Sequence, residues 1–212
     1  MSDPLEGNPR DKALDAFLNL IVDKGYSGVS LRAVCEAAGL GVAELYRLYP
    51  DKIALVAAFI ARIDAEVLTG TPSRSDPEET TRDRLFDVMM RRYDSLKPYR
   101  AALAAIRRAG SRDPVMMLAL GPALRRSMAA MLEAAGVASE GIPGLIRQNG
   151  LLAIHYAVSR VFDRDDSADL SKTMAALDRR LKTAERWAQT LDKYTDFRRK
   201  PEAAPEDGSP AP

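Results

Sequence analysis

The sequence contains few of the residues on which metal sites, disulfide scaffolds and catalytic centres depend. Its 212 residues include one cysteine, Cys35, and one histidine, His155. A single cysteine excludes an internal disulfide framework and is typical of a protein from a reducing compartment. Because neither residue has a second histidine or cysteine at ligand spacing, the sequence predicts no metal site and no cofactor. We therefore expect both to be packed side chains, with His155 in the interior or at an interface.

Long apolar segments and an excess of one charge are also missing. No uncharged apolar run reaches the roughly 18 residues of a membrane-spanning helix, and residues 1–9 lack the apolar core of a signal peptide. The 31 Lys and Arg residues are balanced by 30 Asp and Glu residues. The composition predicts a soluble, cytoplasmic protein without stable membrane insertion, and any surface for nucleic acid must be local.

The apolar residues recur at spacings of three and four, which is the period of amphipathic helices. No sustained alternation of apolar and polar residues indicates a strand, and 46% hydrophobic residues are enough for a core. The sequence therefore predicts an all-α protein of about nine helices. Glycine-rich phosphate loops and other catalytic motifs are absent, so we expect no enzyme.

Capping signals predict where the helices begin and end. The first four helices are expected at 10–24, 31–38 and 42–48 and from residue 52 onward. A turn-forming segment, 69–76, precedes a helix that Asp76 and Pro77 are expected to open and that ends near residue 96. Further helices are expected from Pro98 and Pro114, with a kink or break at Gly121-Pro122. Two long helices, 145–162 and 169–194, complete the chain, and residues 1–9 and 201–212 are expected to be disordered.

The segment 25–52 contains the most specific motif of the chain. It reads GYSGVSLRAVCEAAGLGVAELYRLYPDK, with Gly25 as a stop, Ser30 as a cap and Gly39 at a sharp corner between two short helices. Through Val34-Cys35-Glu36-Ala37-Ala38-Gly39, Leu45-Tyr46, Tyr49 and Lys52 it resembles the helix-turn-helix of the TetR family of bacterial repressors. The resemblance implies a ligand-responsive transcriptional repressor that binds a palindromic double-stranded DNA operator as a homodimer. It also implies a DNA-binding domain over 10–52 and a ligand-binding and dimerisation domain over 53–197.

In the TetR-like module, the third helix enters the major groove and its neighbours hold phosphates. The resemblance implies that the backbone is contacted by Ser30, Arg32, Tyr46 and Lys52. It implies that bases are read by Gly41, Val42, Ala43, Glu44 and Arg47. Between residues 10 and 52, the six basic residues are balanced by six acidic residues. Because affinity rises with the number of phosphates neutralised, this balance predicts weak DNA binding.

The last predicted helix carries a regular apolar seam. Its apolar residues step alternately by four and three: Leu170, Met174, Leu177, Leu181, Ala184, Ala188 and Leu191. Such a heptad pattern fits packing within the chain, and it equally fits a four-helix interface between two copies. The second interpretation predicts a homodimer interface formed by Leu151, His155, Val158, Leu177, Leu181, Ala184 and Ala188.

The larger domain is expected to bind an apolar or amphipathic small molecule between its middle helices. The candidates are apolar and aromatic residues of these helices: Phe86, Met89, Tyr93, Tyr99, Met116, Met117, Met128 and Tyr156. Methionine side chains line adaptable pockets, but they also fill gaps in ordinary cores. Both interpretations fit the spacing of these residues.

A second resemblance leads to an alternative function. Residues 153–187, with the acidic turn Asp165-Asp166-Ser167 and the pair Thr173-Met174, are similar to the lipid-binding accessory proteins of coenzyme Q biosynthesis, which have a TetR-like fold. That resemblance implies a lipid-binding protein that does not bind DNA.

Overall fold

The chain is helical throughout the part that the structure describes. The computed structural model describes residues 8–72 and 78–199, and side chains as far as residue 186. No strand occurs in these residues, and the all-α prediction is confirmed. The elements are α1 (Pro9–Gly28), α2 (Leu31–Ala38), α3 (Val42–Leu48), α4 (Lys52–Thr69), α5 (Thr81–Leu96), the 3-10 helix η1 (Lys97–Tyr99), α6 (Arg100–Gly110), α7 (Pro114–Ala134), α8 (Gly141–Phe162) and α9 (Ser171–Arg199).

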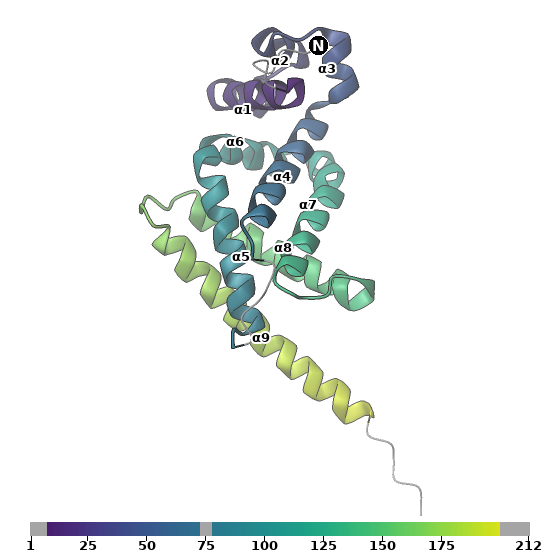
Figure 1. Cartoon of the computed structure of the whole chain (residues 1–212), viewed down its shortest axis with the longest axis vertical. Helices are drawn as coiled ribbons and strands as arrows, with labels where there is room; N and C mark the ends of the chain where they lie inside the picture. Colours follow the sequence, from purple (N-terminus) through teal and green to yellow (C-terminus); the bar gives the residue numbers. More distant parts are fainter. Residues whose placement is uncertain (1–7, 73–77, 200–212) are drawn as a thin grey trace, which may run out of the picture.

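Helices α1 to α3 form a small head at one end of the molecule (Figure 1). The hydroxyl of Ser30 accepts the N–H of Ala33 at 3.2 Å and so caps α2. Gly39 ends α2 in the left-handed region, at φ 67°, which glycine adopts without steric cost. The predicted bounds of both short helices are confirmed.

The beginning of α1 differs from the prediction. Pro9 is the first helical residue, and the side chain of Asn8 accepts the N–H of Arg10 at 3.0 Å. Residue 9 is therefore not part of a disordered tail, because this cap and the first-turn proline start the helix there. At the other end, Gly25 interrupts α1 with φ 69°, as its role as a stop predicts. The expected tail at 201–212 lies outside the described residues.

Helix α4 connects the head to the body, which consists of α4 to α9 (Figure 1). It packs against α7 and α5, while α1 of the head packs against α6. An ion pair of 2.6 Å between Arg62 of α4 and Asp15 of α1 adds a polar contact across this junction. The head therefore contacts the body through α4, which follows α3 directly, and through the packing of α1 on α6.

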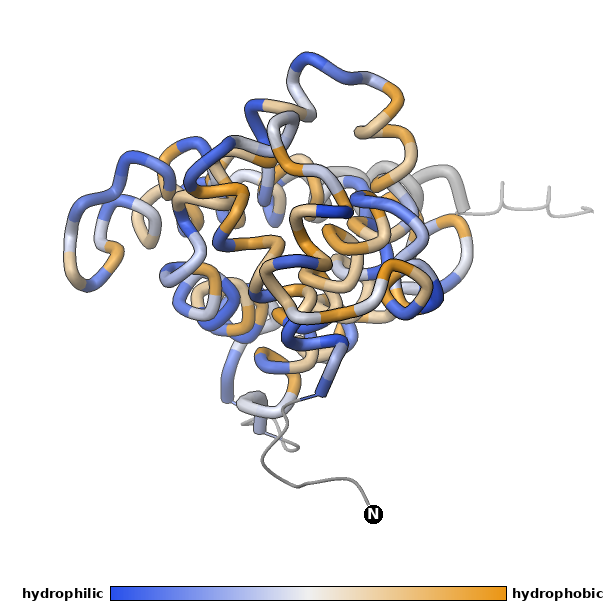
Figure 2. Tube along the Cα trace, turned by 90° about the horizontal axis from the view of Figure 1, so that it is seen from above, coloured by the Kyte–Doolittle hydropathy of each residue, from blue (hydrophilic) through white to orange (hydrophobic). Residues whose placement is uncertain are grey.

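Apolar segments, orange in Figure 2, meet where the helices cross, while polar segments occupy many of the outer turns. The interior of the body contains Tyr93, Met128 and Phe162, all fully buried. Helix α7 is long and apolar enough to cross a membrane by length and composition. It packs along α4 and α8.

Several predicted helix bounds are wrong because other residues form the caps. Helix α5 begins at Thr81, where Thr80 accepts the N–H of Asp83 and donates to its carboxylate at 2.6 Å. Asp76 and Pro77 lie outside the described residues. Helix α7 continues through Pro122 without a break. Helix α8 begins at Gly141, four residues earlier than predicted. Pro143 is tolerated there because it lies in the first turn of the helix, where the N–H that proline lacks needs no partner.

Helix α9 begins at Ser171 and ends at Arg199, so both predicted ends are displaced. Its seam is only partly buried. Leu170, Leu177 and Leu181 are in the core, whereas Met174 and Ala184 are exposed. The side chains of Ala188 and Leu191 lie outside the described part. Because Thr173 and Ala176 are buried as well, α9 uses a face of ordinary helical period against α8 and α5 rather than a strict heptad seam.

Candidate DNA-binding and ligand-binding sites

The outer face of α3 exposes large side chains that a monomer has no structural reason to expose. Val42 and Tyr46 keep 69% and 65% of their surface exposed, while Leu45 is turned into the head. Gly41, Ala43 and Arg47 are exposed on the same short helix or at its cap. Exposed apolar and aromatic side chains on a protruding helix are typical of a recognition surface.

Glu44 differs from the other predicted base contacts because it is partly buried. Its carboxylate therefore does not stand fully on the outer face of α3. Arg47 is exposed, and its Nε donates to the carbonyl of Ala43 at 3.4 Å, one turn earlier in the same helix. The exposed guanidinium of Arg47 is therefore available to a partner outside the chain.

Three of the four predicted phosphate contacts have partners within the described structure, whereas Tyr46 is exposed on α3. Ser30 caps α2, and Arg32 pairs with Glu36 at 3.1 Å on the surface. Lys52 donates to the carbonyl of Tyr26 at 2.9 Å, its Nζ lies 4.5 Å from the centre of that ring, and burial lowers its pKa. Lys52 thus joins the start of α4 to the end of α1, which sequence reasoning missed. Contacts of these residues with DNA remain predictions.

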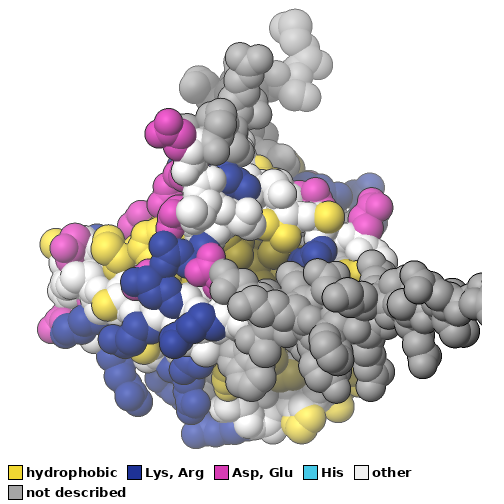
Figure 3. All heavy atoms as spheres, turned by 90° about the horizontal axis from the view of Figure 1, so that it is seen from below, with side chains coloured by type: hydrophobic (Ala, Val, Ile, Leu, Met, Phe, Trp, Pro, Cys, Tyr) yellow, Lys and Arg dark blue, Asp and Glu magenta, His cyan; other side chains and the backbone are white. Residues whose placement is uncertain are grey.

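Basic side chains gather on one part of the face opposite the head (Figure 3). Since the head itself has as many acidic as basic residues, this positive charge lies away from the helix-turn-helix. A strong, nonspecific attraction of the head to DNA is therefore not built into the described surface.

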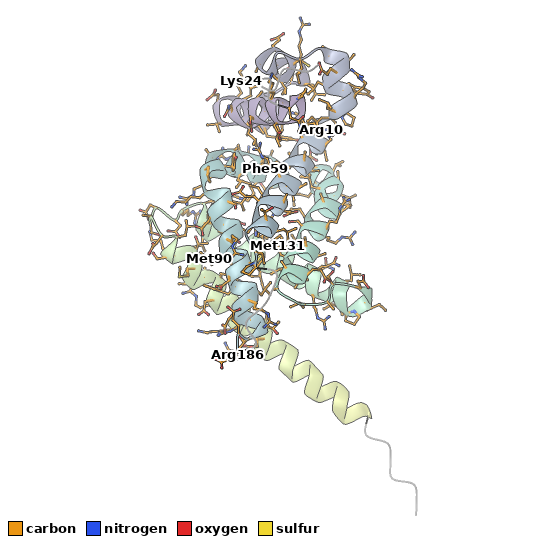
Figure 4. All side chains as sticks on the ribbon, in the orientation of Figure 1. Arg10, Lys24, Phe59, Met90, Met131 and Arg186 are labelled. Atoms are coloured by element: carbon orange, nitrogen blue, oxygen red, sulfur yellow. The ribbon has the colours of Figure 1, made fainter. Side chains whose placement is uncertain are left out.

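The body contains a cavity of about 470 Å³ between α4, α6, α7 and α8. This volume is in the range of about 300–1,000 Å³ that is usual for small-molecule pockets. Phe59 of α4, labelled in Figure 4, belongs to its wall. The other apolar wall residues are Val56, Ile60, Ile63, Leu96, Leu103, Ile106, Met116, Met117, Leu120, Leu124 and Leu152.

Besides Ser111, the cavity wall contains four polar residues that we term the polar edge: Arg92, Arg107, Asn149 and His155. Arg92 is 2% exposed and pairs with Asp64, which also accepts the hydroxyl of Ser127 at 2.7 Å. Arg107 forms a two-point ion pair with Asp163, through Nε at 3.0 Å and through Nη2. Burial lowers the pKa of Arg107 to about 10, so the guanidinium stays charged at neutral pH.

His155 is held by Tyr93, which is fully buried behind it. The Tyr93 hydroxyl lies 3.0 Å from Nδ1 and donates to the carbonyl of His155 at 3.1 Å. Burial lowers the pKa of His155 to about 3, and the positive charges of Arg92 and Arg107 act in the same direction. The imidazole is therefore neutral at physiological pH.

The cavity contains only part of the predicted ligand site. Met116, Met117 and Tyr156 line it, whereas five other candidates do not: Phe86, Met89, Tyr93, Tyr99 and Met128. Met89 and Met128 are fully buried in the core, and the ring of Tyr99 packs edge-on against Phe59. Sequence reasoning missed the residues of α4 and both arginines. Arg92 was detectable, because it interrupts the apolar face formed by Val88, Met89 and Leu96 of α5.

Most residues of the predicted dimer interface are buried within a single chain. Leu151, Val158, Leu177 and Leu181 are at most 4% exposed within a single chain, so they belong to its core. His155 faces the cavity, Ala184 is exposed, and the side chain of Ala188 is not described. The helical period identifies buried residues without saying whether their neighbours belong to the same chain.

A different face of α8 is available for a partner. Five of its exposed residues are apolar and share one side of the helix, with Asn149 between them: Ile142, Leu145, Ile146, Ala153 and Tyr156. We call this set the α8 stripe. Ile142 and Ile146 keep 77% and 66% of their surface exposed. A row of this kind marks an interaction surface.

Within residues 8–72 and 78–199, no group of three or more His, Cys, Asp or Glu side chains is placed to hold a metal ion. Cys35 is buried in the head, as predicted for a packed side chain.

The sequence comparison identifies the head. Residues 13–59 match the family model described as bacterial regulatory proteins, tetR family. The head is therefore similar to the tetR-family domain over the matched residues. The HTH-type transcriptional repressor KstR of Rhodococcus jostii is 43% identical over 53 residues, and KstR of Mycolicibacterium smegmatis is 40% identical over 53 residues. The first alignment spans 25% of this chain and 25% of the relative, so the likeness to KstR is limited to a quarter of either protein.

The comparison with solved structures extends the likeness of the fold to the body. A TetR transcriptional regulator from Nitrosomonas europaea is similar over 84% of this chain and 99% of its own, with a TM-score of 0.67 and 18% identity. Another TetR regulator, from Rhodococcus sp. RHA1, covers 82% of this chain and 94% of its own, with a TM-score of 0.60 and 22% identity. These comparisons do not support the resemblance of residues 153–187 to lipid-binding accessory proteins.

Proposed function

We propose that this protein is a ligand-responsive transcriptional repressor that binds a two-fold symmetric DNA operator as a homodimer. The observation that carries the proposal is the exposed face of α3, with Val42, Tyr46 and Arg47, within the residues that are similar to the tetR-family domain. An α-helix of this kind fits the major groove of B-form DNA, where side chains distinguish base pairs.

The cavity supports the ligand-responsive part of the proposal. Val56, Phe59, Ile60 and Ile63 line it from α4, the helix that begins in the head. Leu103 and Ile106 line it from α6, which packs against α1. A ligand that changes the positions of α4 and α6 therefore changes the orientation of the head. In a dimer this alters the distance between the two α3 helices, and DNA affinity falls when the spacing no longer fits both half-sites.

The α8 stripe supports the homodimer. Two copies that meet through the same apolar row form a two-fold interface, as a palindromic operator requires. The stripe thus replaces the buried residues of α8 and α9 as the proposed interface.

The test of this function is a titration of the purified full-length protein against the DNA upstream of its own gene and a scrambled duplex, by fluorescence anisotropy at several salt concentrations. We expect selective binding that weakens with salt. Equal affinity for both duplexes down to low salt contradicts a repressor function. In that case, native mass spectrometry of the purified protein for a bound lipid is the next measurement.

Arg47→Ala is expected to reduce the preference for the upstream DNA over the scrambled duplex by about tenfold. The reason is that a bidentate contact between arginine and a base contributes about 1–3 kcal/mol of discrimination. Arg126→Ala, at an exposed position of α7 in the body, serves as the matched control and is expected to change nothing. Unchanged selectivity of Arg47→Ala would remove this residue from base recognition.

Lys52→Ala is expected to weaken binding to both duplexes alike and to reduce the salt dependence by about one ion. Because Lys52 also donates to the carbonyl of Tyr26, the same variant should lose about 1 kcal/mol of stability. Thermal unfolding measures the second effect, and Lys24→Ala, an exposed lysine of α1, is the control. A loss of stability with unchanged DNA binding assigns Lys52 to the fold alone.

A further inference from the structure

The cavity is apolar except at the polar edge, where both charged residues are arginines. Arg92 and Arg107 belong to the cavity wall, whereas their counter-ions, Asp64 and Asp163, do not. The charged residues of the cavity wall are therefore both cationic, and Coulomb attraction to them favours an anion inside the cavity.

His155, which lines the cavity from α8, is subject to the same two positive charges. Arg92 and Arg107 both act on its imidazole and oppose its protonation. The two guanidiniums, which come from α5 and α6, therefore act on one place at the α8 side of the cavity.

Arg92 also has a hydrogen-bond donor without an acceptor. Its Nε is buried and has no hydrogen-bond partner, while Nη1 pairs with Asp64. A buried donor that lacks an acceptor costs about 1–3 kcal/mol. Arg107 donates to Asp163 through Nε and Nη2, so its Nη1 takes no part in that ion pair.

From this arrangement we infer that the effector of the protein is an amphipathic carboxylate, whose head is bound by Arg92 and Arg107 and whose apolar body fills the cavity between α4, α6 and α7. The inference rests on the proposed function, since it names the class of ligand that the same cavity takes. A carboxylate matches the planar guanidinium and is its strongest hydrogen-bond partner. The apolar body contacts residues such as Phe59, Leu103 and Leu120.

Calorimetric titration of the purified full-length chain tests the inference without any variant. The probes are octanoate, decanoate and dodecanoate, each compared with the primary amide and the alcohol of the same chain length. We expect at least one carboxylate to bind with a dissociation constant at least about tenfold lower than its uncharged counterparts, because hydrogen bonds to charged groups are the stronger ones. Equal or weaker binding of every carboxylate overturns the inference.

Arg92→Lys tests the role of the guanidinium. Lysine keeps a positive charge for Asp64 but has neither the planar group nor the Nε donor. We expect the affinity for the carboxylate to fall about tenfold and the affinity for the amide to stay the same. Arg91→Lys is the matched control, since Arg91 is the neighbouring residue of α5, bonds to Thr71 at 2.9 Å and does not line the cavity.

The proposed function is tested separately by adding the same probes to the complex with upstream DNA. Binding of a carboxylate that leaves the DNA bound supports the carboxylate site and contradicts ligand-induced release. Release of the DNA by the amide or the alcohol, with no preference for the carboxylate, contradicts the carboxylate site and leaves the repressor function in place.

Discussion

Ile146→Asp is expected to convert the proposed homodimer into monomers and to abolish high-affinity binding to a two-fold symmetric operator. Ile146 is 66% exposed in the single chain and lies in the middle of the α8 stripe. Two-fold symmetry places the new carboxylate in the interface twice, and an uncompensated buried charge costs several kcal/mol. We expect the dissociation constant of the dimer to rise at least about 100-fold. Sedimentation equilibrium measures it, and anisotropy with the upstream DNA gives the consequence for binding.

The control for this prediction is Leu68→Asp, which adds the same charge at an apolar residue of α4 that is 42% exposed and lies outside the stripe. It should remain a dimer. If Ile146→Asp also remains a dimer at micromolar concentration, two copies do not meet through the α8 stripe. Tyr156 belongs both to the stripe and to the cavity wall, so a partner at this face also covers one side of the ligand site.

Asp165→Asn is expected to lower the free energy of unfolding by about 3 kcal/mol, the range for a buried charged group whose hydrogen bonds are broken. Asp165 is fully buried in the turn between α8 and α9. One carboxylate oxygen accepts the N–H and hydroxyl of Ser167, and the other accepts those of Thr173 at 2.7 Å each. An amide would turn its NH₂ group towards one of these pairs, so a backbone N–H loses its acceptor whichever way the side chain lies.

The thermal midpoint of Asp165→Asn should fall by about 6–12 °C at pH 7, given the usual entropy of unfolding for a protein of this size. Asp166→Asn is the control at the next position, because Asp166 is exposed and pairs only with Lys172 at the surface. It should change little. Equal midpoints for the wild type and Asp165→Asn would show that the turn does not depend on this carboxylate.

The effect of Asp165→Asn should also depend on pH. Burial alone would raise the pKa of Asp165, but the hydrogen bonds from Ser167 and Thr173 outweigh it and bring the pKa well below its usual range. A carboxylate with a lowered pKa in the folded state stabilises the fold above its unfolded pKa of about 3.9 and loses this contribution as the pH falls below that value. The difference between wild type and variant should therefore be constant from pH 7 to 5 and shrink in stronger acid. Urea unfolding at each pH measures it.

Local signals were sufficient to predict the head. Ser30 and Gly39 determine the start of α2 and the corner after it through hydrogen bonds within a few residues, so sequence position alone implies the structure. The same is true of Asp113, which accepts the N–H of Met116 and opens α7. Where two capping signals compete, as at the start of α5, the sequence does not decide between them, because Thr80 and Asp76 are both good caps.

The sequence by itself determined the helical class, the helix-turn-helix and the existence of apolar faces on the later helices. Only the tertiary structure decided what those faces contact. It placed Leu177 and Leu181 inside the chain, left Ile142 and Ile146 exposed, and brought Arg92 and Arg107 from different helices to one cavity. The physical reason is that a period of 3.6 residues determines which side of a helix is apolar, whereas the neighbour of that side depends on how the helices cross.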